Sequence, residues 1–136
     1  MAEQVEQRHL VLILARSFAS RLATPVWLVD AEGTVIYFNE AAEAVLARRF
    51  IEGPGMPASE WSTMFTPLDE RGNLVPYERL PLGIAISEGR ADHQDLDIKG
   101  ADGVDRRIGV TAFPLFAHPG ECLGALAIFW ERPESA

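Results

Sequence analysis

The sequence predicts an α+β fold, in which one five-stranded antiparallel sheet carries helices on one face and an amphipathic helix precedes the sheet. Three observations predict it. Two strand-length apolar runs joined by a short turn follow an initial helical segment, helix-forming segments fill the middle, and three strand-like runs separated by turns occupy the last third. We expect an N-terminal helix for dimerisation or capping over residues 1–23, a single domain over 24–131 and a frayed tail over 132–136.

The first helix is expected over Glu3–Leu22, because Leu10, Leu14 and Phe18 recur every fourth residue. Apolar residues also occupy the positions between Leu10 and Leu14, so the helix needs cover on more than one side. We expect it to cover the sheet face that the other helices leave open, or to pair with a second copy of the chain. Its Glu, Gln, His and Arg residues argue against a membrane span and a signal peptide.

The next segment predicts a hairpin that leads into a capped helix. The runs Pro25–Asp30 and Thr34–Phe38 read as paired strands, with Asp30 and Gly33 at the first and last positions of a tight turn. Asn39 suits a helix N-cap, because its side chain can accept a hydrogen bond from a free N–H group of the first turn. The helix is expected from Glu40 to about Arg49.

Turn-rich stretches separate two further short helices. Helical structure is expected over Ser59–Phe65 and again over Leu82–Glu88, where a start near Pro81 and an end at Gly89 follow the preferences of helix termini. Between them, Asp69–Gly72 reads as a turn.

Three strands are expected in the last third, over Asp92–Lys99, Arg107–Phe116 and Cys122–Trp130. Gly100–Gly103 suits the hairpin turn between the first two. The run Cys122–Trp130 is apolar at both alternating sets of positions, so both of its faces are expected to be covered.

The composition indicates a folded, acidic domain. The chain has 136 residues, 48% of them apolar, and a formal net charge of −8. Such a charge disfavours phosphate backbones and anionic membranes, so we expect neither nucleic acid nor membrane as a partner. Cys122 is the single cysteine, which excludes an intrachain disulfide and fits a reducing, cytoplasmic location.

Four blocks follow one another along the chain: Val29–Ala42, Leu80–Gly89, Gly100–Leu115 and Gly124–Trp130. In this order they resemble a PAS domain, a sensory module of bacterial signalling proteins, and the resemblance covers about Thr24–Glu131. The resemblance implies a module that senses a signal, dimerises and relays its state, with many different ligands or none. Such modules occur in two-component systems, for example, upstream of a histidine kinase, cyclase or regulator. Such modules often end in an Asp-Ile-Thr-like exit motif, whereas this chain reads Trp-Glu-Arg-Pro over 130–133, which argues against direct coupling to a C-terminal effector.

The resemblance does not identify a cofactor. Flavin-binding members carry a reactive Cys in an Asn-Cys-Arg-Phe-like turn, and haem-binding members a His on the helix expected here over Leu80–Glu88; this chain has neither. Cys122 is interpreted as a small, half-buried apolar side chain and His93 as a solvated strand-edge residue. The three histidines are too scattered for zinc.

The remaining candidate site is an apolar pocket where the sheet curls over its helices. If the family layout holds, its lining is Leu28, Tyr37, Leu82, Ile86, Leu96, Ile108, Val110 and Ile128. Hydroxyl groups would come from Tyr37 and Thr111. The alternative is that these residues close on each other as ordinary core.

We therefore expect a sensory or interaction module without enzymatic activity that forms a homodimer through Leu10, Leu14, Phe18 and the sheet face, with a possible small-molecule ligand. One alternative is a pure dimerisation module with a filled core. Another is a small lyase or isomerase, which would need an inward-facing carboxylate with a raised pKa. Asp95 and Asp97 instead share the face of their strand opposite Leu96 and Ile98, where solvent is expected.

Overall fold

The computed structural model describes residues 2–53 and 55–132 of the chain, with side chains from residue 10 onward. Its helices and strands in chain order are α1 Ala2–Ser20, β1 Val26–Asp30, β2 Val35–Phe38, α2 Glu40–Leu46, α3 Ala58–Met64, η1 Tyr77–Arg79, α4 Pro81–Glu88, β3 Asp92–Lys99, β4 Asp105–His118 and β5 Glu121–Glu131. Most of the expected tail, residues 133–136, lies outside the described residues.

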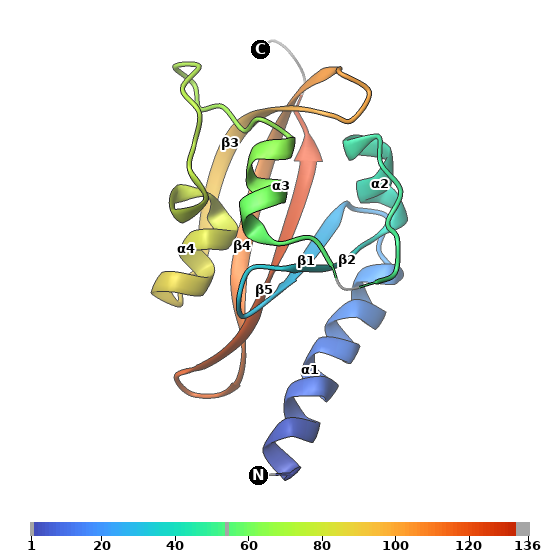
Figure 1. Ribbon diagram of the computed structural model, residues 1–136, viewed down its shortest axis with the longest axis vertical. Helices are drawn as coiled ribbons and strands as arrows, with labels where there is room; N and C mark the ends of the chain where they lie inside the picture. Colours follow the sequence, from blue (N-terminus) through green and yellow to red (C-terminus); the bar gives the residue numbers. More distant parts are fainter. Residues whose placement is uncertain (1, 54, 133–136) are drawn as a thin grey trace.

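The five strands form one antiparallel sheet in the order β2-β1-β5-β4-β3, which confirms the predicted fold class (Figure 1). The last strand, β5, lies in the centre, where it pairs with β1 through Trp27 and Ala127 and with β4 through Thr111 and Ile128. A central strand has neighbours at both edges and, here, cover on both faces. Its continuous apolar sequence is the consequence.

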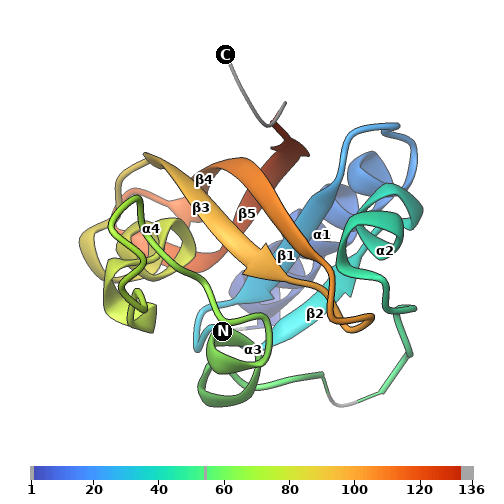
Figure 2. The ribbon, with the colours of Figure 1, turned by 90° about the horizontal axis from the view of Figure 1, so that it is seen from above.

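Helices α2, α3 and α4 cover one face of the sheet, which we call the inner face, and α1 lies against the other, the outer face (Figure 2). On the outer face Ala15 and Ala19 of α1 pack against Val26, Leu28 and Leu126 of the sheet. The N-terminal part of α1 projects beyond the end of the sheet (Figure 1). In the part of the chain that the structure describes, no helix is both long enough and apolar enough to cross a membrane.

The first hairpin forms as predicted because Asp30 organises its turn. The backbone N–H of Gly33 donates to the carbonyl oxygen of Asp30 at 3.0 Å, and the Asp30 carboxylate accepts from the N–H of Glu32 at 2.9 Å and of Thr34 at 3.0 Å. Gly33 has φ +85°, which an L side chain rarely adopts. The turn therefore ends β1 at Asp30 and leads directly into β2, which pairs antiparallel with β1.

The second helix is shorter than its sequence predicts. We expected it to reach about Arg49, but α2 ends at Leu46, because Ala47 takes a left-handed conformation with φ 55°. The Glu43 carboxylate accepts from the backbone N–H of Phe50 at 2.7 Å and holds the chain as it turns back after the helix.

Candidate functional site

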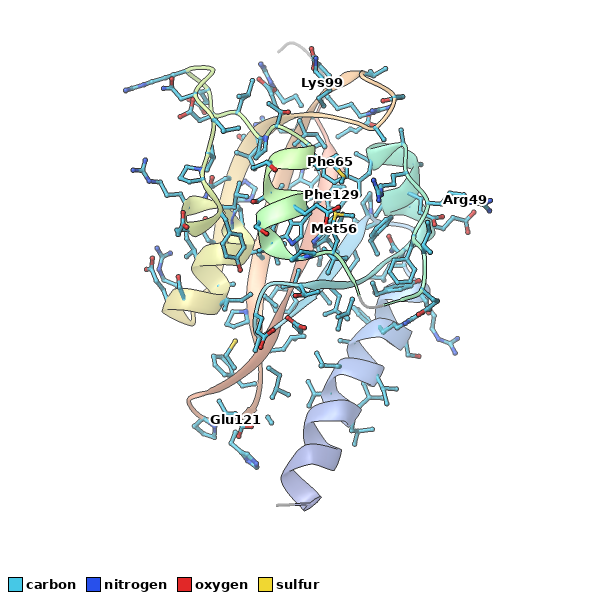
Figure 3. The ribbon with its side chains drawn as sticks, viewed as in Figure 1. Arg49, Met56, Phe65, Lys99, Glu121 and Phe129 are labelled. Carbon is cyan, nitrogen blue, oxygen red and sulfur yellow. The ribbon has the colours of Figure 1, made fainter. Side chains whose placement is uncertain are left out.

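A cavity of about 90 Å³ lies between the inner face of the sheet and the helices that cover it. In Figure 3, Phe65 and Phe129 mark the region where α3 lies over β5. The lining residues come from the sheet, from α2, α3 and α4, and from the segments that flank these helices: Trp27, Leu46, Trp61, Ser62, Phe65, Pro67, Leu80, Pro81, Leu82, Leu96, Ile98, Ile108, Val110, Ala127 and Phe129. The wall is almost wholly apolar, and none of the lining residues carries a charge.

An aromatic cluster around Trp27 forms one side of this cavity. The Trp27 ring stacks on Phe38 with centroids 5.0 Å apart, and it meets Trp61 and Phe65 edge-on at 5.6 Å and 6.0 Å. Edge-to-face and offset contacts of this kind add to the stabilisation that burial gives, so they help to hold this wall in place.

Three of the lining residues have polar atoms in their side chains: Trp27, Trp61 and Ser62. The indole N–H of Trp61 is satisfied, since it donates to the carbonyl oxygen of Gly33 at 2.8 Å. The indole nitrogen Nε1 of Trp27 is buried and has no hydrogen-bond partner among the described residues. An unsatisfied buried donor is energetically costly and is uncommon in folded proteins.

The structure brings four of the eight proposed pocket residues to this cavity, namely Leu82, Leu96, Ile108 and Val110. Leu96, Ile108 and Val110 lie on strands in which inward-facing apolar residues alternate with other residues, whereas Leu82 lies on α4. Ile86 packs against the inner core without lining the cavity.

The structure places the other three, Leu28, Tyr37 and Ile128, in the outer cluster beneath α1, away from the cavity. Thr111, paired with Ile128, shares that outer side. The β1–β2 pairing is also irregular between Leu28 and Val29, and this shift puts both Ile36 and Tyr37 among the outer residues. These positions are corrections to the predicted layout, and they leave the cavity without the expected Tyr and Thr hydroxyl groups.

The aromatic wall is the part of the lining that sequence reasoning missed. Trp27 precedes the chosen Leu28 in a run that is apolar at every position, and Trp61 and Phe65 belong to a short segment between turns. Large aromatic residues in so short a helix were the available signal, because such side chains seldom stay exposed.

Charged groups gather on the edge strand β3 instead. Asp95 pairs with Arg132 and faces His93 at 3.5 Å, while Asp97 pairs with Arg107 at 3.0 Å. These side chains are half-exposed, as expected for the solvated face, and within residues 2–53 and 55–132 no group of His, Cys, Asp and Glu is arranged to hold a metal ion. Cys122 is half-buried at the start of β5, with its sulfur 3.3 Å from the Gly124 carbonyl oxygen.

The second candidate site is the exposed face of α1, which we call the α1 stripe. It consists of Leu10, Ile13, Leu14 and Phe18, whose exposed fractions are 53%, 61%, 59% and 57%. Four large apolar side chains at helical spacing on one exposed face are typical of an interaction surface.

The opposite side of α1 is anchored to the domain. Arg16 pairs with Glu52, and its guanidinium lies 4.6 Å from the centre of the Tyr37 ring. The hydrogen bond from Arg16 lowers the pKa of the Glu52 carboxyl. The helix is therefore held in place while its stripe stays accessible.

Part of the outer sheet face beyond α1 is also apolar and exposed. Trp130 is 39% exposed and stacks on His93 with ring centroids 5.8 Å apart, and Phe113 is 36% exposed. The indole of Trp130 lies over Gly109, where a Cβ atom would come within 2.8 Å of the ring. We call these residues, Trp130, His93 and Phe113, the outer sheet patch.

A family model described as the PAS fold matches residues 20–136. It covers most of the chain and agrees with the sheet order and the helical cover of the inner face. The chain belongs to the PAS family, whose fold is typical of sensory and signalling modules. None of the curated proteins is significantly similar to the chain.

Solved structures agree on the fold. The PAS domain of BvgS from Bordetella pertussis is similar, with a TM-score of 0.64 at 17% identity over 90% of this chain and 87% of that chain. A PAS domain from Colwellia psychrerythraea has a TM-score of 0.65 at 16% identity over 92% and 99%. The LOV protein of Rhodobacter sphaeroides has 0.66 at 19% identity over 100% and 70%. At these identities the similarity concerns the fold alone.

Proposed function

We propose that this chain is a non-enzymatic signalling module that forms a homodimer and passes the state of its inner core to that dimer. The α1 stripe carries the proposal, because four large apolar side chains there are more than half exposed while the opposite side of the helix is packed. Burying such residues against a second copy would remove apolar surface from water, which drives association.

A second copy is the partner that this surface suits. The chain carries a formal charge of −8, yet the stripe itself contains no charged side chain, so two copies can meet there without bringing like charges together. The outer sheet patch lies on the same side of the sheet as α1 and can extend the contact. A two-fold axis beside α1 would place the stripe of each copy against that of the other.

Asn39 supplies the physical link between the core and this surface. Its side-chain amide donates to the carbonyl oxygen of Ala19 in α1, and its side-chain oxygen accepts from Val26 of β1 and Ala42 of α2. A shift of β1 or α2 relative to the core therefore acts on the end of α1. To pass a change in the core to the dimer surface, the elements between them must be physically connected in this way.

The absence of an enzymatic role is supported by the chemistry of the cavity. Its lining contains no carboxylate, histidine or cysteine that could act as a base or nucleophile. We propose a sensing role for this cavity, with a histidine kinase, cyclase or regulator as the downstream partner in a cytoplasmic signalling system.

Light scattering and sedimentation on two variants test the dimer. Leu14→Glu and Phe18→Glu place a charge in the stripe, so each should shift the dimer toward monomer by at least tenfold in dissociation constant. Because both side chains are exposed, the thermal midpoint of the isolated monomer should change little.

The matched control is Leu74→Glu, since Leu74 is 55% exposed in a turn that belongs to neither the stripe nor the outer sheet patch. It should leave association unchanged. A wild-type protein that is monomeric at high micromolar concentration, or stripe variants that dimerise like the wild type, would contradict the proposal.

A further inference from the structure

One lining residue of the cavity carries a group that apolar packing does not explain, the Nε1–H group of Trp27. Trp27 is 5% exposed, and its indole nitrogen is buried without a hydrogen-bond partner in the part of the chain that the structure describes. Tryptophan offers a donor only, so this group can be satisfied only by an acceptor. Trp27 lines the cavity, so a molecule bound there could supply that acceptor.

The other polar side chains of the lining do not supply it. Trp61 is itself a donor, already bonded to the Gly33 carbonyl oxygen at 2.8 Å. Ser62 carries the one remaining hydroxyl among the lining residues, and it makes no hydrogen bond with the Trp27 nitrogen. A water molecule is a poor match, because a buried water commonly needs about two to four polar partners and this wall is apolar apart from these groups.

We propose that the cavity binds a small, uncharged, carbon-rich molecule with one hydrogen-bond acceptor, such as a ketone, aldehyde or ester oxygen, and that Trp27 Nε1 donates to that acceptor. The lining excludes a charged ligand, because it provides no counter-charge to offset the cost of burying an ion. The inference rests on the proposed sensing role of this cavity and adds the class of the sensed molecule.

The size of the cavity limits the ligand further. Its volume is about 90 Å³, whereas an engineered apolar cavity of about 150 Å³ binds benzene. The space is smaller than that, so about six heavy atoms are the upper limit for the ligand, and the lining side chains must move outward to admit a molecule of that size.

Two probes of nearly equal shape test the acceptor. Cyclopentanone carries a carbonyl oxygen where methylenecyclopentane carries a methylene group, so the pair differs in the acceptor while the ring is kept. The three tryptophans give three indole N–H signals in a proton–nitrogen correlation spectrum. Cyclopentanone should saturably shift the Trp27 indole proton downfield and bind about fivefold more tightly than the alkene.

Variants assign this preference to one donor. In Trp27→Phe the preference for the ketone should be lost or reversed, because a buried carbonyl without a donor gives up its hydrogen bonds to water, while methyl signals of the lining still report binding of both probes. Trp130→Phe makes the same exchange in the outer sheet patch and should keep the preference. Ser62→Ala should keep it as well, and it also tests the inference if Trp27→Phe does not fold.

The inference is overturned if both probes shift the Trp27 indole proton equally, if neither probe shifts the lining methyl signals at its solubility limit, or if Ser62→Ala abolishes the preference. Sedimentation of the same samples keeps the two proposals separate. Loss of probe binding with an intact dimer rejects the ligand class alone, and a monomer that binds cyclopentanone rejects the dimer alone.

Discussion

The side-chain amide nitrogen of Asn39 lies 2.9 Å from the backbone carbonyl oxygen of Ala19, near the C-terminal end of α1. The same nitrogen lies 2.9 Å from the carbonyl oxygen of Thr24, and the side-chain oxygen accepts from Val26 and Ala42, each at 3.0 Å. Asn39 is 1% exposed. This one buried amide thus caps α2, accepts a hydrogen bond from the first residue of β1 and holds the C-terminal end of α1 on the outer face.

Replacing Asn39 by alanine should lower the free energy of unfolding by about 3 kcal/mol, because the helix loses its cap and buried backbone groups lose their partners. Urea denaturation followed by circular dichroism measures this loss. Hydrogen exchange should also show faster exchange in the last turn of α1 than in β4 and β5 under conditions where the variant stays folded.

The Asn73→Ala variant provides the control for the same chemical change. Asn73 is exposed, and the turn that contains it is organised by the Asp69 carboxylate, which accepts from the backbone N–H of Asn73 at 2.9 Å. The Asn73→Ala substitution should lower the free energy of unfolding by less than about 0.5 kcal/mol. Equal destabilisation by the two variants would reject the role assigned to Asn39.

Alanine substitutions at Gly33 and Gly72 distinguish the cost of backbone strain from the cost of steric contact. Both have positive φ, at +85° and +80°, but a Cβ atom on Gly33 would lie 2.4 Å from the Tyr77 hydroxyl oxygen, whereas one on Gly72 would meet nothing within 4 Å. Alanine at Gly72 should cost about 1 kcal/mol, from the left-handed conformation alone. Alanine at Gly33 should cost about 2–3 kcal/mol, because Tyr77 must move as well. Thermal denaturation of the two variants tests the difference, and equal costs would contradict it.

Tyr77 should make the domain sensitive to high pH. Burial raises the pKa of its phenol above the ordinary value of 10.0, with further contributions from Asp30, Glu78 and Cys122. The folded state therefore favours the neutral phenol, so this contribution to stability is complete below about pH 10 and is lost as the pH rises through the folded-state pKa.

The Tyr77→Phe variant should consequently lose less stability than the wild type between neutral and strongly alkaline pH. Urea midpoints measured across that range test this, with Tyr37→Phe as the control that keeps Tyr77 in place. Identical alkaline losses in the wild type and Tyr77→Phe would show that the phenol makes no such contribution.

Much of the fold could be predicted from the sequence, because its turns and helix caps are formed by residues that lie close together in the chain. Asp30, Gly33 and Asn39 act through contacts within a few residues, and each takes its predicted role in a turn or cap. The long-range hydrogen bonds of Asn39 could not be predicted in the same way, because nothing in the local sequence indicates that Ala19 lies beside Asn39 in the fold.

The residues of the candidate site could be predicted from the sequence only on strands in which apolar and polar residues alternate. Leu96 in β3 lies between Asp95 and Asp97, so its inward direction is evident from sequence. In β1 and β5 every position near the site is apolar, so alternation gives no sign of which set faces the cavity. The predicted lining takes Leu28 and Ile128 from these strands, whereas the positions that face the cavity are Trp27, Ala127 and Phe129.

Disulfide trapping at Leu14 tests the central claim, association through α1, most directly. In a Cys122→Ser background, Leu14→Cys places one thiol in the α1 stripe, and two thiols can join only if their Cα atoms approach within about 7 Å. We predict a covalent dimer in high yield under mild oxidation, whereas Leu74→Cys should form no disulfide-linked dimer in the same background. A Leu14→Cys protein that forms no covalent dimer, or that cross-links no more than Leu74→Cys, would contradict the account.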